Sequence, residues 1–193
     1  ILASQNKNDK LLEYIADYRK HIDNVHHFLS TGNTAIDCIV STKLSAAKQK
    51  GIQVSYSILL PQKIPLDDIS LCSLIGNLFN NAIEACEKIP SDKKDRCWIN
   101  FTIQPYQNMF GIYMENGSNG EYLFDKNGML LSTKSDTAKK RLSHGIGLKR
   151  IQELAEQADG LIDINPGKED FKLHIMIPLL EKDPDMDPDG STN

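Results

Sequence analysis

The stretch Ser73-Leu-Ile-Gly-Asn-Leu-Phe-Asn-Asn-Ala-Ile-Glu-Ala-Cys86 decides the fold of the C-terminal part of the chain. Its apolar residues recur at helical spacing, which predicts a long helix over residues 67–88. Asn77, Asn81 and Glu84 are four and three residues apart, so they share one face of that helix. Polar groups on an apolar helix are costly to bury without partners, and an amide oxygen is a ligand that a hard cation such as Mg²⁺ accepts. The alternative is that these amides only cap or hydrogen-bond the neighbouring backbone.

A glycine-rich turn, His144-Gly-Ile-Gly-Leu148, supplies the second half of the pattern, because it precedes a helix predicted over residues 147–158. Glycines permit close approach of a ligand to the backbone, and a helix N-terminus favours phosphate. Upstream, Lys134 and the basic run 139–141 supply cations that could reach phosphates. The alternatives are an ordinary glycine turn and a solvated basic loop.

The sequence of the N-terminal region predicts two helices. Residues 7–30 carry a heptad-like apolar stripe, Gly32-Asn33 breaks it, and residues 34–50 form a second amphipathic helix. A short break between two such helices predicts an antiparallel hairpin, which cannot bury its stripe alone. A dimeric four-helix bundle is the expected solution.

The sequence of the rest of the chain predicts five strands and two polar segments. Alternating or apolar runs predict strands over residues 52–59, 97–105, 109–115, 161–165 and 171–179. The polar stretch 117–143 is long for a loop, which indicates a functional lid or a disordered segment. The acidic, proline-bearing tail 181–193 is expected to be disordered.

Composition narrows the function classes. The 193 residues suffice for one or two domains, and the net charge of −4 without a basic stripe gives no reason to expect nucleic-acid binding. No apolar stretch approaches the ~18 residues that span a bilayer. The four cysteines lack Cys-x-x-Cys spacing, so reduced thiols are expected. The chain begins at Ile1 rather than at methionine, and we expect a fragment of a longer protein.

The order and spacing of these motifs resemble the GHKL ATPase superfamily. Within it the chain is similar to sensor histidine kinases of the peptide quorum-sensing type, close to the citrate-sensor branch. Residues 77–85 resemble the N-box and residues 144–148, preceded by Ser132-Thr133-Lys134, the G2 box. The resemblance implies an α+β chain with three parts: a helical dimerisation and phosphotransfer hairpin (1–50), a GHKL (Bergerat) α/β sandwich that binds ATP (51–181), and a disordered tail (182–193).

The resemblance also implies roles for individual residues. Asn81 would ligate Mg²⁺, Asn77 would line the phosphates and Lys134 would neutralise phosphate charge. Residues 117–143 would be the ATP lid. The rest of the implied ATP-binding set is the G2 box, in which Gly145 and Gly147 would contact phosphates through backbone N–H groups: His144, Gly145, Ile146, Gly147 and Leu148.

Two departures from the family pattern matter. The superfamily's G1 box is Asp-x-Gly-x-Gly, whose Asp binds the adenine amino group, whereas this chain has Glu115-Asn-Gly-Ser-Asn-Gly120. Either Glu115 or Asn116 could accept that hydrogen bond, and we favour Asn116.

The second departure concerns the phosphoacceptor. The branch's usual phosphoacceptor position is occupied by Ala16, which leaves His21, with Asp17 one turn earlier, as the candidate acceptor. The alternative for His21 is an ordinary helix-surface histidine.

The resemblance implies the cytoplasmic part of a bacterial two-component sensor histidine kinase. It would bind Mg·ATP, form a homodimer through the hairpin, and pass the phosphoryl group to a histidine and then to the receiver domain of a response regulator. A membrane sensor would precede this fragment. The first alternative is a pseudokinase that binds ATP and acts as a scaffold, which Ala16 favours. A weaker one is a GHKL ATPase or protein-serine kinase acting on an external protein.

Overall fold

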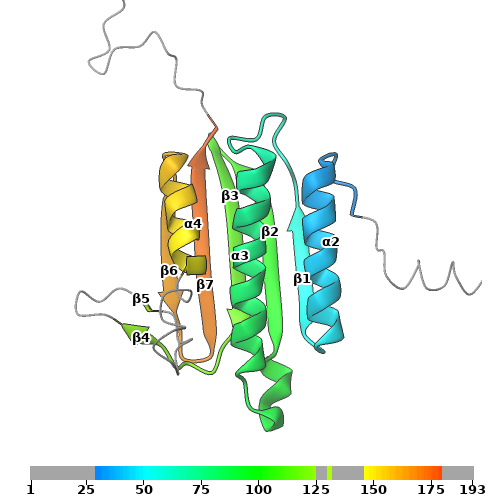
Figure 1. Cartoon of the computed structure of the whole chain (residues 1–193), viewed down its shortest axis with the longest axis vertical. Helices are drawn as coiled ribbons and strands as arrows, with labels where there is room; N and C mark the ends of the chain where they lie inside the picture. The colour runs from blue at the N-terminus through cyan, green and yellow to red at the C-terminus, as the bar shows by residue number, and fades with distance from the viewer. Residues whose placement is uncertain (1–28, 125–129, 132–145, 180–193) are drawn as a thin grey trace, which may run out of the picture.

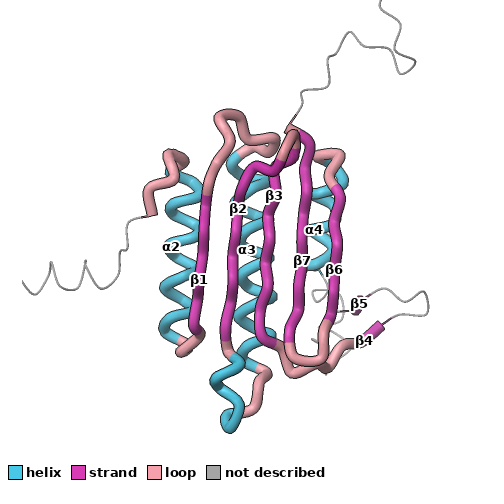
Figure 2. The backbone as a smooth tube through the Cα atoms, turned by 180° about the vertical axis from the view of Figure 1, so that it is seen from behind, coloured by secondary structure: helices cyan, strands magenta, loops and turns pink. Residues whose placement is uncertain are grey.

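A computed structural model describes residues 29–124, 130–131 and 146–179 of the chain. In this part, three α-helices lie side by side on one face of a five-stranded sheet (Figure 1). The view from behind shows the other face of the sheet without a helix over it (Figure 2). The described chain is therefore a two-layer α/β sandwich, as the sequence predicts for its C-terminal domain.

The elements follow the predicted order. The α-helices are α2 (Thr34–Gln49), α3 (Asp68–Glu87) and α4 (Ile146–Gln157), and a short 3₁₀ helix, η1 (Ser91–Arg96), follows α3. The main sheet has the order β1-β2-β3-β7-β6, with β1 parallel to β2 and every other pair antiparallel. Its strands are β1 (Gln53–Ile58), β2 (Trp98–Tyr106), β3 (Met109–Gly117), β6 (Leu161–Pro166) and β7 (Asp170–Pro178).

Helix α3 forms the centre of the helical layer. The Asp67 side chain caps its N-terminus by accepting a 2.9 Å hydrogen bond from Ser70 N, and this bond holds the pKa of the Asp67 carboxyl below its ordinary value. Phe79 meets Phe101 of β2 edge to face at 4.9 Å between ring centroids. The apolar face of α3 is buried along its whole length: Leu71, Leu74, Ile75, Leu78, Phe79, Ala82, Ile83 and Cys86.

Helix α2 buries part of its apolar stripe within the described chain. Ile36, Val40 and Ala47 are fully buried and α2 packs on α3 and β1, while the hairpin and four-helix bundle expected for residues 1–50 stay predictions. Asn33 caps α2 by accepting from Ile36 N at 2.9 Å, and its Nδ2 donates to Asp68 Oδ1 at 3.0 Å. The physical reason is that β1 and α3 already offer an apolar surface, so this helix buries its stripe within its own chain. The first helix of the expected hairpin lies outside the described residues.

Side chains of β3 point alternately to the two faces of the sheet, one covered by the helices and one uncovered. Phe110, Ile112 and Met114 belong to the core beneath the helices, whereas Tyr113 and Glu115 point to the uncovered face. The Tyr113 ring lies over Gly111, where an added β-carbon would be 2.7 Å from the nearest ring atom. This alternation continues to the end of the strand, where the candidate site begins.

The segment after β3 holds a feature that the sequence pattern did not indicate. Two short strands, β4 (Leu123–Phe124) and β5 (Leu130–Leu131), pair antiparallel apart from the main sheet. The rest of the predicted lid, residues 125–129 and 132–143, and the predicted disordered tail lie outside the described residues. Among the described residues, no helix combines the length and apolar character needed to cross a bilayer.

Candidate functional site

The two sequence motifs meet in space. Gly147 lies in the first turn of α4, and a β-carbon added to it would be 3.2 Å from Asn81 Oδ1 and 3.5 Å from Asn77 Oδ1. The amide oxygens of α3 thus face the start of α4, and the two helices lie next to each other in both views (Figures 1 and 2). A β-carbon at this position would therefore press on the Asn81 amide, and glycine avoids that tight contact.

The side chain of Asn77 is divided between two tasks. Its Nδ2 donates a 2.8 Å hydrogen bond to Ser73 O, one turn earlier in α3. Bonding to neighbouring backbone therefore accounts for the nitrogen of Asn77, while its oxygen lies on the Gly147 side. The adjacent Asn80 differs, because it is exposed and its Oδ1 accepts from Lys43 Nζ at 2.7 Å.

Helix α4 is held by its apolar face, so the position of its first turn is fixed. Ile151, Leu154 and Ala155 are buried, and half-buried Leu148 packs against the core. At the other end, Gly160 N donates to Ala155 O at 2.8 Å and closes the helix. The first turn of a helix presents backbone N–H groups and the positive end of the helix dipole, which together attract anions.

The end of β3 distinguishes Glu115 from Asn116. Asn116 is 1% exposed and lies on the covered face, where its Nδ2 donates to Gly117 O at 2.9 Å. Glu115 points to the uncovered face, where its Oε1 lies 3.4 Å from His174 Nε2. Strand alternation therefore places only Asn116 on the side of α3.

The residues after Asn116 form a compact polar network that the sequence patterns missed. Ser118 is 3% exposed, and Tyr122 Oη lies 2.8 Å from Ser118 Oγ and 2.9 Å from Asp170 O. Burial raises the pKa of the Tyr122 hydroxyl. The available signal was Ser118 itself, which stands where the G1 pattern that begins at Asn116 has a glycine.

The described residues offer amide oxygens rather than a cluster of anionic ligands for a metal. Within them no group of three or more His, Cys, Asp or Glu side chains could hold a metal ion. Mg²⁺ retains waters and phosphate oxygens and needs few protein ligands, so an amide pair beside a glycine cradle fits a magnesium–nucleotide complex. His21, Lys134, His144 and Gly145 lie outside the described residues, and Ile146 is described as the first residue of α4.

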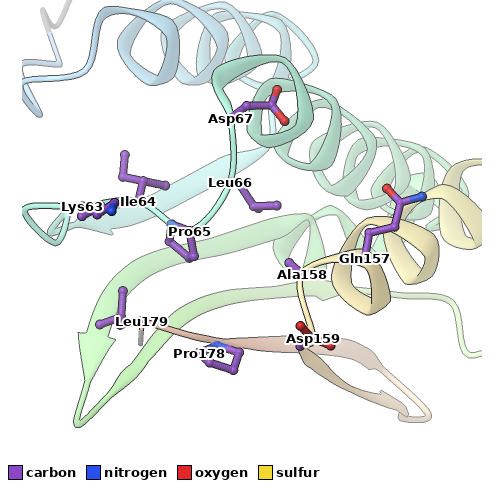
Figure 3. Close-up of a pocket in the computed structure, with 10 residues that line it drawn as sticks. All are labelled: Lys63, Ile64, Pro65, Leu66, Asp67, Gln157, Ala158, Asp159, Pro178 and Leu179. Carbon is purple, nitrogen blue, oxygen red and sulfur yellow. The ribbon is translucent and has the colours of Figure 1, made fainter. Parts of the chain in front are cut away.

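A cavity of about 580 Å³ lies elsewhere in the fold (Figure 3). It opens between the loop preceding α3, the C-terminal end of α4 and the end of β7, and its walls include Leu66, Ala158 and Leu179. These are the ends of α3 and α4 away from Asn81 and Gly147. The cavity is therefore separate from the amide face.

Comparison with known proteins identifies the family. Residues 66–178, more than half of the chain, match the model of the GHKL domain. The chain belongs to the GHKL family. No match was found among curated proteins.

Solved structures of histidine kinases share the fold of this GHKL chain. Acinetobacter baumannii histidine kinase AdeS is 11% identical with a TM-score of 0.54, covering 91% of this chain and 82% of AdeS. Full-length ShkA in complex with AMPPNP is 14% identical with a TM-score of 0.53, covering 75% of this chain and 29% of ShkA. The nucleotide-free catalytic domain of ThkA is 16% identical with a TM-score of 0.50, covering 77% of this chain and 92% of that domain. The predicted family and sandwich fold are thus confirmed, while the quorum-sensing branch stays a prediction.

Proposed function

We propose that this GHKL chain is the ATP-binding and phosphotransfer part of a bacterial sensor histidine kinase. The observation that carries the proposal is how close Gly147 lies to the amide oxygens of Asn77 and Asn81, which a β-carbon added to it would approach to 3.5 and 3.2 Å. It joins a cation-binding amide face to a phosphate-binding helix start, in a chain whose residues 66–178 match the GHKL domain.

The residues divide the work by their chemistry. Asn81 Oδ1 would be the protein's ligand to Mg²⁺, which when bound neutralises charge on the phosphates. Asn77 and the first turn of α4 would line the phosphates, and Lys134 would add a positive charge. Asn116, buried at the end of β3, would accept the hydrogen bond from the adenine amino group. These ATP-binding residues position the phosphates and neutralise their charge, and they form no covalent bond to them.

We assign dimerisation and phosphotransfer to the N-terminal region. The heptad stripe of residues 7–30 needs a helical partner, and we place the homodimer contact there. His21 would receive the γ-phosphoryl group and pass it to the receiver domain of a response regulator. A membrane-anchored sensor preceding this cytoplasmic part is the further expectation.

Nucleotide binding is tested with a matched pair of variants. Asn81→Ala should weaken Mg·ATP binding by about a hundred-fold or more, since the Mg²⁺ ion loses the amide oxygen that the protein contributes to it. Asn80→Ala, one residue along the same helix, should leave binding within about two-fold. Calorimetric titration of ATP with Mg²⁺ measures both, and equal effects of the two substitutions would contradict the proposed site.

Phosphotransfer is tested with ATP labelled at the γ position. Acid-labile, alkali-stable label that disappears in His21→Ala would support a histidine kinase with a displaced acceptor. ATP binding without label would instead favour the pseudokinase, for which Ala16 at the usual acceptor position is the specific observation.

A further inference from the structure

The G1 position of this chain raises a chemical question that rests on the proposed function. A carboxylate there accepts hydrogen bonds through either oxygen, so its orientation is immaterial. An asparagine has one acceptor and one donor end, and a flipped amide would turn its N–H groups toward the adenine amino group. Asn116 can read adenine only if something fixes which end faces the base.

The first fixing contact is the peptide unit that follows. Asn116 Nδ2 donates to Gly117 O at 2.9 Å, which commits the nitrogen and leaves Oδ1 as the acceptor end. The Cys86 thiol of α3 donates to the same carbonyl at 3.8 Å. The orientation of the Asn116 amide therefore depends on where the Gly117 carbonyl points.

The Gly117 carbonyl belongs to the same planar peptide unit as the N–H of Ser118. Ser118 N donates to Glu169 O at 2.9 Å and extends the β3–β7 ladder by one residue. Because the peptide unit is rigid, anchoring its N–H fixes the direction of its C=O. Gly117 also has no room to move toward η1, since a β-carbon on it would overlap Arg96 O.

The Ser118 side chain is held in turn by Tyr122. Asp170 O can only accept, so Tyr122 Oη donates to it at 2.9 Å, and Ser118 Oγ donates to Tyr122 Oη at 2.8 Å. Ser118 Oγ also accepts from Gly120 N at 3.1 Å. The Tyr122 ring lies 5.9 Å from the ring of Phe171, which pairs with Asn116 across the ladder.

We propose that Ser118 and Tyr122 are positioning residues for base recognition, which lock the Asn116 amide with its oxygen toward adenine. In this way they compensate for the amide of Asn116, which must be oriented to accept a hydrogen bond, whereas the carboxylate of the G1 pattern accepts through either oxygen. We name Ser118, Tyr122 and the Asp170 carbonyl the base latch. Neither side chain of the base latch needs to touch the nucleotide for this role.

The test measures base preference by displacing a fluorescent ATP analogue with ATP and with GTP in the presence of Mg²⁺. Tyr122→Phe removes one hydroxyl and should lower the preference for ATP over GTP by about five-fold, the worth of one net hydrogen bond. Tyr113→Phe removes a hydroxyl from the uncovered face of β3 and should leave the preference unchanged. Equal effects of the two substitutions would overturn the proposal.

Rescue separates orientation from general support of the fold. In an Asn116→Asp background, Tyr122→Phe should change the preference by less than about two-fold, because either carboxylate oxygen can accept. An undiminished effect in that background would show that Tyr122 supports only the fold.

A nucleotide-free measurement keeps the two proposals distinguishable. If the wild-type chain binds no ATP, the proposed function fails, but the base latch can still be read from hydrogen exchange of the Asn116 side-chain amide by NMR. Tyr122→Phe should speed that exchange about five-fold. Unchanged exchange would overturn the latch whatever the nucleotide result.

Discussion

The two faces of the five-stranded sheet carry different kinds of side chain. Under the helices the sheet presents Phe101, Ile112 and similar apolar residues, and Asn116 and Ser118 are its only buried polar residues in the described part. On the uncovered face, His174 contacts both Tyr113 and Glu115, with the Tyr113 and His174 rings 5.1 Å apart. Polar side chains are ordinary on an open face but uncommon in a core, so burial distinguishes the amide at the end of β3 from the neighbouring carboxylate.

The largest expected effect comes from a core residue of the covered face. Phe79→Ala should lower the free energy of unfolding by about 3–5 kcal/mol, because it removes a fully buried ring packed on Phe101. Leu161→Ala, at a side chain 72% exposed, should change it by less than about 0.5 kcal/mol. Urea denaturation measures both, and similar values would mean that the helical layer does not cover the sheet as described.

The next effect concerns the contact of α4 with the amide face. Gly147→Val should weaken Mg·ATP binding by about ten-fold or more, since its β-carbon would press on Asn81 Oδ1 and move α4. Gly76→Ala serves as the control, because the nearest atom to its added carbon is Ile39 Cδ1 at 3.9 Å. It should preserve binding and stabilise α3 by about 0.5–1 kcal/mol. Tolerance of valine at position 147 would refute the predicted role of the contact.

A third pair of variants addresses the two faces at adjacent residues. Asn116→Ala should weaken ATP binding by about ten-fold, because the adenine amino group loses its acceptor. Glu115→Gln should change binding by less than about two-fold, since this side chain faces His174 across the sheet from α3. The reverse ranking in a calorimetric titration would transfer the role to Glu115.

The effect that is smallest at neutral pH is a pH dependence from a buried thiol. Burial raises the pKa of Cys86 from 9.0 to about 12, so its neutral form is favoured in the folded state. The stability that this contributes is complete below pH 9.0 and is lost as the pH rises toward 12. Cys86→Ala should therefore flatten the decline of unfolding free energy over that interval, and an unchanged slope would assign the decline to other groups.

Much of the fold could be predicted because its signals are local. The spacing of Leu74, Leu78 and Phe79 indicated α3, and alternation indicated β2 and β3. The partner of α2 could not be predicted in this way, because an apolar stripe shows that a helix buries one face without showing against what. The same stripe at Ile36 and Val40 suits a bundle or a sheet.

The candidate site was predictable in part for a similar reason. The motif spacing indicated that Asn81 and Gly147 belong together, and strand parity separates Asn116 from Glu115 once the register is known. The Ser118–Tyr122 contact was not predictable, because it depends on how β3 ends against β7. Hydrogen bonds formed by a turn with a distant strand leave no periodic signal.

The capping side chain at the start of α2 has a mechanical consequence. Asn33 bonds both to Ile36 of its own helix and to Asp68 at the start of α3, while Thr31 is tied to Asp37 through its backbone and its hydroxyl. These bonds join the two helix starts, and the buried stripe of α2 joins the helices along their length. The chain at Thr31 is therefore linked by hydrogen bonds to the starts of both helices. A displacement applied there would act on α2 and on the helix that carries Asn77 and Asn81.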